Sequence, residues 1–268
     1  MERIVVLSDQ QARFDDRLTE QSVLSFLRDF QPDLLINNGD LFDLEALSHY
    51  RKSLDAQASL EADLAAGRAI LAHQRAACPD ADIVLVEGNH EERLTRFLLD
   101  NARELSDSPM LHPAAFLDTQ RFGVRYVGPY GVGLDWHGVL VYHGALVRAE
   151  SGASARAEYL STGTSGVSGH THRLGSYYHT DRSGAHAWYE GGCLCNIEGP
   201  DVPPDARGPR VRNAQQVFLA GYYDSGLWNL YQVSITRHCF IWEGKLYVPD
   251  GAARDDALDA ARFLGSLA

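Results

Sequence analysis

Short apolar runs alternate with amphipathic segments along the first half of the chain. The apolar runs are residues 4–7, 34–36 and 83–86, and each ends in polar residues. Between the runs, apolar side chains recur at helical spacing, as at Val23, Leu27 and Phe30. Helices are therefore expected before Pro32, over about residues 53–77 and over about residues 91–105. Strands that alternate with helices predict βαβ units and a largely parallel sheet.

The second half has fewer helical segments and more short apolar runs. One run ends at His143, another ends at residues 170–172, and a helix is expected over about residues 149–160. Later alternating runs predict an antiparallel second sheet. They are residues 177–178, 187–189, 228–235, 238–242 and 246–248.

The remaining segments give no sign of a boundary between two domains. Residues 199–212 are rich in Pro, Gly, Asp and Arg and predict a surface loop, and a short helix is expected from about Arg254. No repeat and no clear linker interrupt the pattern. We therefore expect one α/β domain over residues 1–268, with two sheets.

Composition and charge limit the classes of molecule that the protein is expected to bind. The chain is 45% hydrophobic and 22% charged, ordinary values for a globular protein, which excludes a disordered chain. It has 24 basic and 36 acidic residues, a formal net charge of -12, which argues against binding long nucleic acid and favours a small substrate.

The sequence has neither an apolar run of membrane-spanning length nor a signal peptide, so a cytoplasmic location without membrane contact is expected. The oligomeric state stays open.

The four cysteines are expected to be reduced thiols. They are Cys78, Cys193, Cys195 and Cys239. A cytosolic domain of this size seldom keeps disulfides. Cys193-Leu194-Cys195 could in principle bind a soft metal, but no CxxC pair accompanies it.

Five predicted strands end in residues that can bind metals. They are Asp9, Asp40, Asn89 with His90, His143, and His170 with His172. Ligands bind beyond the carboxyl ends of strands in open α/β sheets, so these side chains are expected to converge. Carboxylate, amide and imidazole groups together suit a pair of divalent ions that clamp a phosphoryl group during its transfer.

The same residues resemble the ordered blocks of the calcineurin-like metallophosphoesterase superfamily. The blocks are Asp9-x-Gln11, Gly39-Asp40, Gly88-Asn89-His90-Glu91, His143-Gly144 and Gly169-His170-Thr171-His172. The stretch GNHEERL at residues 88–94 looks most like the stand-alone enzymes of bacteriophages and bacteria. The resemblance implies a two-sheet β-sandwich of mixed strands flanked by helices.

The resemblance also implies roles for the matched residues. The implied ligands of the first metal ion are Asp9, Asp40 and His172. Those of the second are Asn89, His143 and His170, with Asp40 bridging the two ions. His90 would act as a general acid or stabilise the leaving oxygen, and a metal-bound hydroxide would be the nucleophile. Mn²⁺ is favoured for the two divalent ions, with Fe, Zn, Ni and Mg as alternatives.

One position departs from the family pattern. The family has His where this chain has Gln11, which is either a weaker oxygen ligand or a turn residue without metal contact. Glu91 would orient His90 or favour a helix start. Arg93 and Arg173 are candidate phosphate donors, although solvated side chains are the simpler interpretation.

These features favour a two-metal phosphodiesterase acting on small diesters such as 2′,3′-cyclic nucleotides. A protein phosphatase or nucleotide phosphomonoesterase is the alternative, but residues 39–45 (GDLFDLE) lack the Arg that ends the corresponding phosphatase block. A nuclease would be expected to bring a basic groove and a DNA-capping domain. A non-catalytic binding module would be expected to have lost His90 or several ligands.

Overall fold

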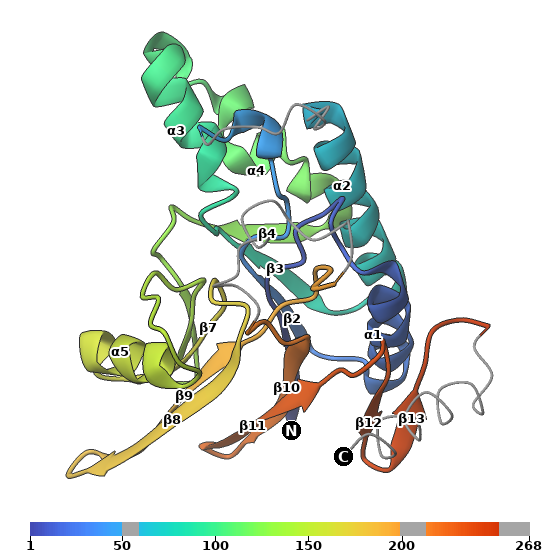
Figure 1. Cartoon of the computed structure of the whole chain (residues 1–268), viewed down its shortest axis with the longest axis vertical. Coiled ribbons are helices and arrows are strands. Elements are labelled where there is room, and N and C mark those ends of the chain that lie inside the picture. Colours follow the sequence, from blue (N-terminus) through green and yellow to red (C-terminus); the bar gives the residue numbers. More distant parts are fainter. Residues whose placement is uncertain (50–58, 199–212, 252–268) are drawn as a thin grey trace.

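The computed structural model describes residues 1–49, 59–198 and 213–251, which form two main sheets flanked by helices (Figure 1). The first sheet has six strands in the order β11-β10-β1-β2-β3-β4. They are β1 (Glu2–Leu7), β2 (Leu34–Asn38), β3 (Asp82–Val86), β4 (Val124–Val127), β10 (Val217–Asp224) and β11 (Leu227–Ser234). Strands β1 to β4 are parallel, whereas β10 and β11 form an antiparallel hairpin beside β1.

The central strand β1 is buried on both faces. Val5 and Leu7 pack into the core beneath the helices, while Ile4 and Val6 pack between the two sheets. Successive strand residues point to opposite faces, so this continuous apolar run suits a sheet covered on both sides.

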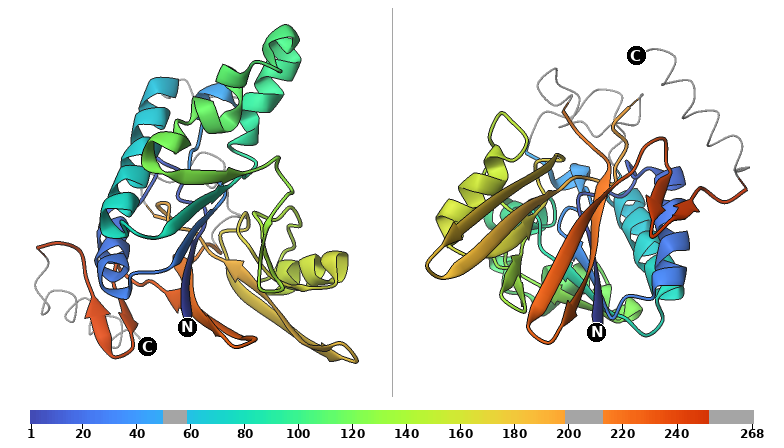
Figure 2. Two further views of the ribbon diagram at one scale, coloured as in Figure 1. Left: turned by 180° about the vertical axis from the view of Figure 1, so that it is seen from behind. Right: turned by 90° about the horizontal axis from the view of Figure 1, so that it is seen from below.

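Two long helices cover the outer face of the first sheet (Figures 1 and 2). Helix α1 (Arg17–Phe30) begins where the Asp16 carboxylate accepts hydrogen bonds from the N–H groups of Leu18 and Thr19. Helix α2 (Leu60–Ala77) begins after Ser59, whose hydroxyl accepts from Ala62. The small hairpin β12 (Phe240–Trp242) and β13 (Lys245–Tyr247) packs its aromatic rings against Phe26 of α1.

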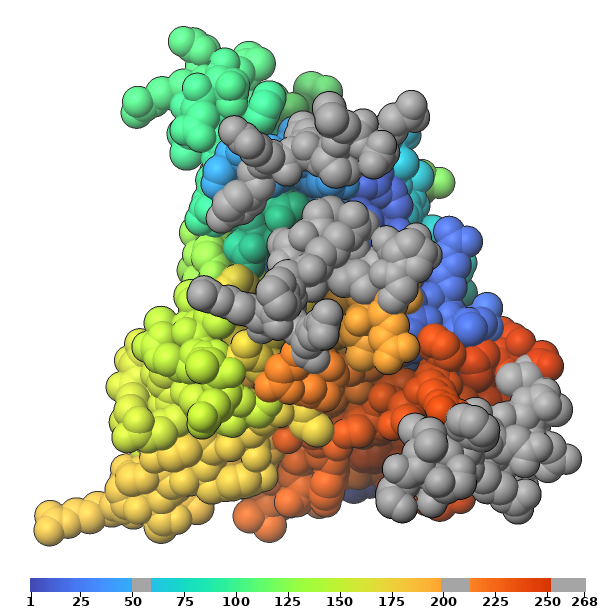
Figure 3. Space-filling view, viewed as in Figure 1, coloured from blue at the N-terminus to red at the C-terminus, as the bar shows by residue number. Residues whose placement is uncertain are grey.

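The second sheet has five strands in the order β5-β6-β7-β9-β8. They are β5 (Leu134–Trp136), β6 (Val139–Val141), β7 (Ser165–Ser168), β8 (Leu174–Asp181) and β9 (Gly184–Gly191). Helix α5 (Ala153–Thr162) packs on the outer side of this sheet, where its Tyr159 lies in one apolar cluster with Trp188 of β9. The β8–β9 hairpin projects from the body of the molecule (Figure 3).

Helices α3 (Glu92–Asn101) and α4 (Pro113–Phe116) complete the described elements with short 3₁₀ turns. Within the described ranges, no helix combines the length and the apolar character that crossing a membrane requires.

This arrangement confirms the two-sheet fold with flanking helices and corrects several details. The predicted strand at residues 228–235 belongs to the first sheet, because β11 pairs with β10 and not with β9. Residues 238–248 form the separate β12–β13 hairpin, so the C-terminal strands do not make one antiparallel second sheet. The helix expected at residues 149–160 begins instead at Ala153, and α3 ends at Asn101, ahead of a 3₁₀ turn.

Some expectations fall on residues outside the described ranges. They are the start of the predicted helix at residues 53–58, the loop at residues 199–212 and the C-terminal helix from Arg254.

Candidate metal centre

The predicted site residues lie just beyond the ends of five strands from both sheets. Asp9 and Asp40 follow β1 and β2, and Asn89 follows β3 in the first sheet. His143 and His170 follow β6 and β7 in the second sheet. The N–H of His170 donates to both carboxylate oxygens of Asp9, at 3.1 and 2.9 Å, and so joins the two groups. We call this region the rim.

The backbone of the rim adopts an uncommon conformation. Five of the predicted site residues have positive φ, between 45° and 65°, although none is glycine. They are Asp9, Gln11, Asp40, His170 and His172. Such residues carry strain of about 1 kcal/mol or more each, and strained positions concentrate at functional sites.

Two glycines permit the close approach of these loops. A Cβ atom on Gly39 would lie 2.5 Å from Nδ1 of His143, and one on Gly88 would lie 2.2 Å from Oδ1 of Asp40. Real atoms do not approach so closely. The glycines that precede Asp40 and Asn89 therefore let the strand ends pack against one another.

Electron-rich atoms converge on one side of the rim. Nε2 of His143 lies 3.1 Å from Oδ2 of Asp40 and 3.0 Å from Oδ1 of Asn89. Nδ1 of the same ring lies 2.9 Å from the carbonyl oxygen of Asn38, to which it would donate its proton. Nε2 then presents a lone pair to two oxygen acceptors, an arrangement that needs a proton or a metal ion between them.

His170 extends this cluster. One donor atom from each of Asp40, His143 and His170 lies within 4.8 Å of the others. Burial and the neighbouring His143 lower the pKa of His170, which keeps the imidazole neutral and able to bind a metal ion. Asp40, Asn89, His143 and His170 are thus brought together as the sequence suggested.

The charges of Asp40 and His143 support each other. Burial alone would raise the pKa of Asp40, but the imidazoles of His143 and His90 outweigh it and hold that pKa far below its usual range. Burial alone would lower the pKa of His143, but the carboxylates of Asp40 and Asp9 raise it to about 9. The site therefore attracts positive charge strongly.

The other side of the rim contains Asp9, Gln11 and His172. Nε2 of His172 lies 3.3 Å from Oδ1 of Asp9. Gln11 is fully buried, and neither its amide oxygen nor its amide nitrogen has a hydrogen-bond partner among the described residues. A buried amide without partners is costly, so this side chain fits a group that the chain alone does not supply. Both sides of the rim therefore have donors that fit divalent ions.

His90 lies beside the cluster and is held by its neighbours. Its Nδ1 lies 3.3 Å from Oδ2 of Asp43, and its Nε2 lies 3.6 Å from Oδ2 of Asp40. Arg93 places Nη2 2.9 Å from Nε2 of His90 and donates from Nη1 to Asp43. The expectation that Arg93 is a solvated side chain is wrong, because it is only 12% exposed and contacts both residues.

Glu91 does not contact the His90 ring in the manner expected of an orienting partner. Its carboxylate accepts three hydrogen bonds of 2.9 Å from the backbone N–H groups of Gly88, Asp40 and Phe42. Burial and the charge of Asp40 raise the pKa of Glu91 to about 7, against these donors. Glu91 thus fixes the backbone around Asp40. It does stand at the start of a helix, as expected, because α3 begins at Glu92.

Arg173 lies away from the rim, which agrees with a solvated side chain, whereas Asp43 is a site residue that the sequence pattern did not indicate. The guanidinium of Arg173 donates to the carbonyl oxygen of Arg148, which lies outside the rim cluster. Asp43 was not singled out, although it is 1% exposed and contacts His90. Its position three residues after Asp40, within the same block, was the available signal.

A pocket of about 330 Å³ opens beside the rim. Its described lining includes Asn89, Arg93, Arg96, Phe97 and His49. It places two guanidinium groups, one aromatic ring and the carboxylate of Asp100 next to the predicted ligand Asn89. A pocket of this size can hold part of a small organic phosphate.

Comparisons with known proteins agree with this geometry. The calcineurin-like phosphoesterase family matches residues 2–174. The gene 54 protein of Mycobacterium phage D29 is 31% identical over 189 residues, covering 69% of this chain and 74% of that protein. The gene 54 protein of Mycobacterium phage L5 is 29% identical over 187 residues, covering 66% and 72%.

Solved structures that match this chain include those of Vps29 proteins. Vps29 of Chaetomium thermophilum is 11% identical, with a TM-score of 0.46, and the match covers 95% of this chain and 98% of that one. Vps29 of Entamoeba histolytica, solved with Zn²⁺, is 11% identical, with a TM-score of 0.45, covering 91% and 95%.

Proposed function

Because the chain belongs to the calcineurin-like phosphoesterase family, which implies metal-dependent phosphoester hydrolysis, we propose that it is a two-metal phosphodiesterase acting on small diesters such as 2′,3′-cyclic nucleotides. The observation that carries this proposal is the convergence of Asp40, Asn89 and His143 within 3.1 Å contacts beside a buried His90. Both ligand-type and proton-donor groups are therefore present at one place.

The residues divide into two ligand sets that share Asp40. The first set would be Asp9, Asp40, His172 and, through its amide oxygen, Gln11. The second set would be Asp40, Asn89, His143 and His170. Two divalent ions held there would polarise the phosphoryl oxygens and lower the pKa of a water molecule. We favour Mn²⁺, because the first set is rich in oxygen donors.

His90 would supply a proton to the leaving oxygen or stabilise the charge that develops there. Asp43 faces Nδ1 of the ring, so the second nitrogen, Nε2, is the atom turned toward Asp40 and the rim. Arg93 lies against the same Nε2 and is placed to donate to a phosphate oxygen. Both groups are nearly buried, which strengthens their electrostatic effect.

A small substrate is supported by the surroundings of the rim. The neighbouring pocket of about 330 Å³ offers Phe97 to a planar group, and Arg96, which pairs with Glu92 at 2.6 Å, lines it as well. The net charge of -12 disfavours long nucleic acid. A diester suits one binding mode in which the phosphate lies on the ions and the leaving group enters this pocket.

An activity panel with the metal-stripped protein tests the proposal. It compares an aryl diester, an aryl monoester, 2′,3′-cyclic and 3′,5′-cyclic nucleotides and single-stranded DNA, each with added Mn²⁺, Zn²⁺, Ni²⁺, Fe²⁺ or Mg²⁺. We expect diester turnover that depends on added metal and disappears with excess chelator. Turnover confined to monoesters would replace the diesterase with a phosphomonoesterase, and preferred cleavage of DNA would indicate a nuclease.

The remaining outcomes are equally decisive. Full activity in excess chelator would overturn the metal mechanism. No turnover of any ester, despite metal binding at the rim, would favour a binding module. The control variant is His179→Ala, which should keep the wild-type activity. Its ring is 41% exposed on β8, away from the rim.

A further inference from the structure

Two cysteines lie behind the rim in an extended segment after β9. Cys193 and Cys195 are fully buried, and Leu194 between them packs into the core beneath the helices. The N–H groups of Leu194 and Cys195 both donate to the carbonyl oxygen of Asp9 at 3.1 Å, which fixes the segment against the rim. In an extended segment, successive side chains point to opposite sides. The thiols of Cys193 and Cys195, two residues apart, therefore lie on the same side.

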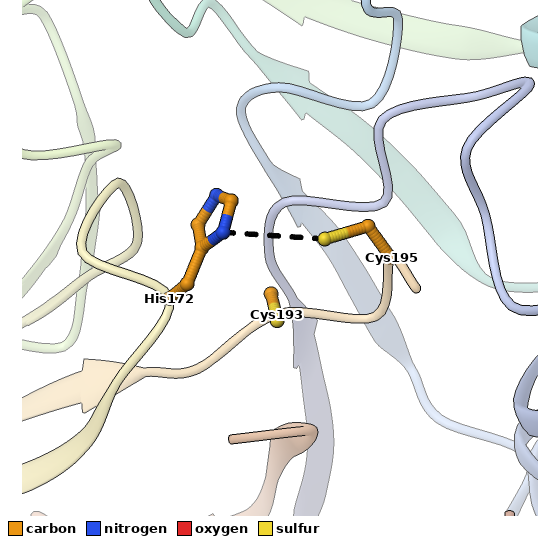
Figure 4. Close-up of side chains that lie close together, drawn as sticks. All are labelled: His172, Cys193 and Cys195. Carbon is orange, nitrogen blue, oxygen red and sulfur yellow. Dashed lines mark hydrogen bonds between the residues drawn. The ribbon is translucent and has the colours of Figure 1, made fainter. Parts of the chain in front are cut away.

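His172 completes a group of three donors with these thiols. Its Nδ1 lies 4.0 Å from Sγ of Cys195 (Figure 4). One donor atom from each of His172, Cys193 and Cys195 lies within 4.8 Å of the others. His172 is 6% exposed, so all three groups are shielded from water.

The chemistry of this group differs from that of the rim. Thiolate sulfur selects Zn²⁺ and similar ions, whereas carboxylate and amide oxygens suit Mn²⁺ and Mg²⁺. Ligand distances of about 2.3 Å for sulfur and about 2.0 Å for imidazole nitrogen place two donors of a tetrahedral ion roughly 3.5 Å apart. The observed separations therefore need only a small contraction around an ion.

We propose that His172, Cys193 and Cys195 form a separate site for a thiophilic divalent ion such as Zn²⁺. We call it the cysteine site. A fourth position is left for water or another donor, as in three-ligand zinc sites. None of Asp40, Asn89, His143 and His170 supplies a donor to the cysteine site.

The cysteine site and the rim share one imidazole ring. Nδ1 of His172 faces Cys195, while Nε2 lies 3.3 Å from Asp9 at the first rim set. An imidazole can bind ions through both nitrogens only after it loses its last ring proton, so one ion disfavours the other. If the proposed function holds, Zn²⁺ at the cysteine site withdraws His172 from the rim and inhibits the Mn²⁺-supported reaction.

Cobalt substitution tests the site without relying on activity. The full-length, metal-stripped protein is titrated with Co²⁺ under anaerobic conditions with a thiol-free reductant. Thiolate-bound Co²⁺ has an intense near-ultraviolet charge-transfer band, which nitrogen and oxygen ligands at the rim do not produce. We expect the band in the wild type, in Cys239→Ser and in Asp40→Asn, and its loss in Cys193→Ser and Cys195→Ser.

Two results would overturn the proposal. One is the absence of the band in the wild type, either with both thiols reduced or because a Cys193–Cys195 disulfide resists the reductant. The other is a band that persists in the double variant of both cysteines. X-ray absorption of the wild-type cobalt protein, with sulfur neighbours expected, keeps the test valid should the serine variants fail to fold.

Zinc inhibition is measured as a second readout. We expect Zn²⁺ to inhibit the Mn²⁺-loaded wild type and Cys239→Ser, and to inhibit Cys195→Ser less, each relative to its own activity without zinc. Equal inhibition of all three would overturn the shared-ring consequence. A protein with the cobalt band and no esterase activity would leave the cysteine site standing and refute only the proposed function.

Discussion

Oδ2 of Asp43 lies 3.3 Å from Nδ1 of His90, and both side chains are about 2% exposed. A buried carboxylate near one ring nitrogen favours a proton on that nitrogen. Nε2, which accepts from Nη2 of Arg93, is consequently the nitrogen that faces the rim. This pair therefore separates a reacting group, His90, from a positioning group, Asp43.

Replacing His90 should slow the reaction without removing the metal ions. We expect His90→Ala to lower kcat by roughly 10²–10⁴, the usual contribution of a positioned proton donor, and less for nitrophenyl substrates whose leaving group needs no proton. Asp43→Asn should have a smaller effect on kcat and should shift its pH profile, with KM little changed. Steady-state kinetics and metal analysis check this, and loss of metal from His90→Ala as complete as from Asp40→Ala would contradict it.

Replacing Asp40 should remove both metal ions. One carboxylate serves both ligand sets, so Asp40→Ala is expected to lose nearly all metal and nearly all activity. Metal analysis after dialysis measures the first effect. Asp80→Ala, which removes an exposed carboxylate in a turn, is the control. Retention of one tightly held ion by Asp40→Ala would show that Asp40 does not bridge.

Gln11 should set the affinity of the first ligand set. That set offers mostly oxygen, whereas the second offers two imidazoles, so we expect one labile and one tight ion. Gln11→His should tighten the labile ion and reduce the need for added Mn²⁺. Calorimetric titration of the stripped protein decides this. Two equally tight ions in the wild type, or unchanged affinities in Gln11→His, would refute a metal role for Gln11.

Removing the Glu91 carboxylate should destabilise the fold. Its three hydrogen bonds satisfy buried N–H groups, and each unsatisfied group costs about 1–3 kcal/mol, so Glu91→Ala should lower the free energy of unfolding by at least ~2 kcal/mol. Urea unfolding in excess chelator measures this without metal effects. The exposed Glu104→Ala should change little. A Glu91→Ala loss no larger than that of Glu104→Ala would contradict the assignment.

Asp63 should make stability depend on pH. It is fully buried beside Arg13, and burial raises its pKa to about 6 from an ordinary value of 3.8. Because the folded state binds this proton more tightly, its contribution is fully present below pH 3.8 and is lost as the pH rises through about 6.

The free energy of unfolding of the wild type, relative to Asp63→Asn, should therefore fall by about 2 kcal/mol between pH 4 and pH 7. Urea unfolding at several pH values, in excess chelator, measures this difference. Asp29→Asn, which alters an exposed carboxylate paired with Lys245, is the control. A difference that stays constant, or that grows in the opposite direction, would contradict the effect of burial.

The parallel part of the fold was predictable because local pattern and tertiary position agree there. The apolar runs of β1, β2 and β3 are buried on both faces, and their short length together with the polar residues that bound them locates them as strands. The placement of β11 was not predictable, because an alternating strand fits the edge of either sheet. Its position depends on β10, whose run Val217–Asp224 returns beside β1 from far along the chain.

The candidate site was predictable where a residue type and a strand end coincide, as at Asp40 and His143. Side-chain direction was harder to judge. Glu91 turns away from the His90 ring toward the backbone of Gly88 and Phe42, and no spacing in the sequence encodes that choice. The proximity of Cys195 to His172 likewise follows from packing of a late segment against the first loop, which only the fold specifies.

The bond from the N–H of His170 to the carboxylate of Asp9 crosses from one sheet to the other. Any ion held by ligands from both loops would act as a staple between the sheets, and its binding free energy would add to the stability of the folded chain. Metal supply would then govern the lifetime of the protein as well as its turnover. The metal-free chain would then be the form that proteases cleave most readily.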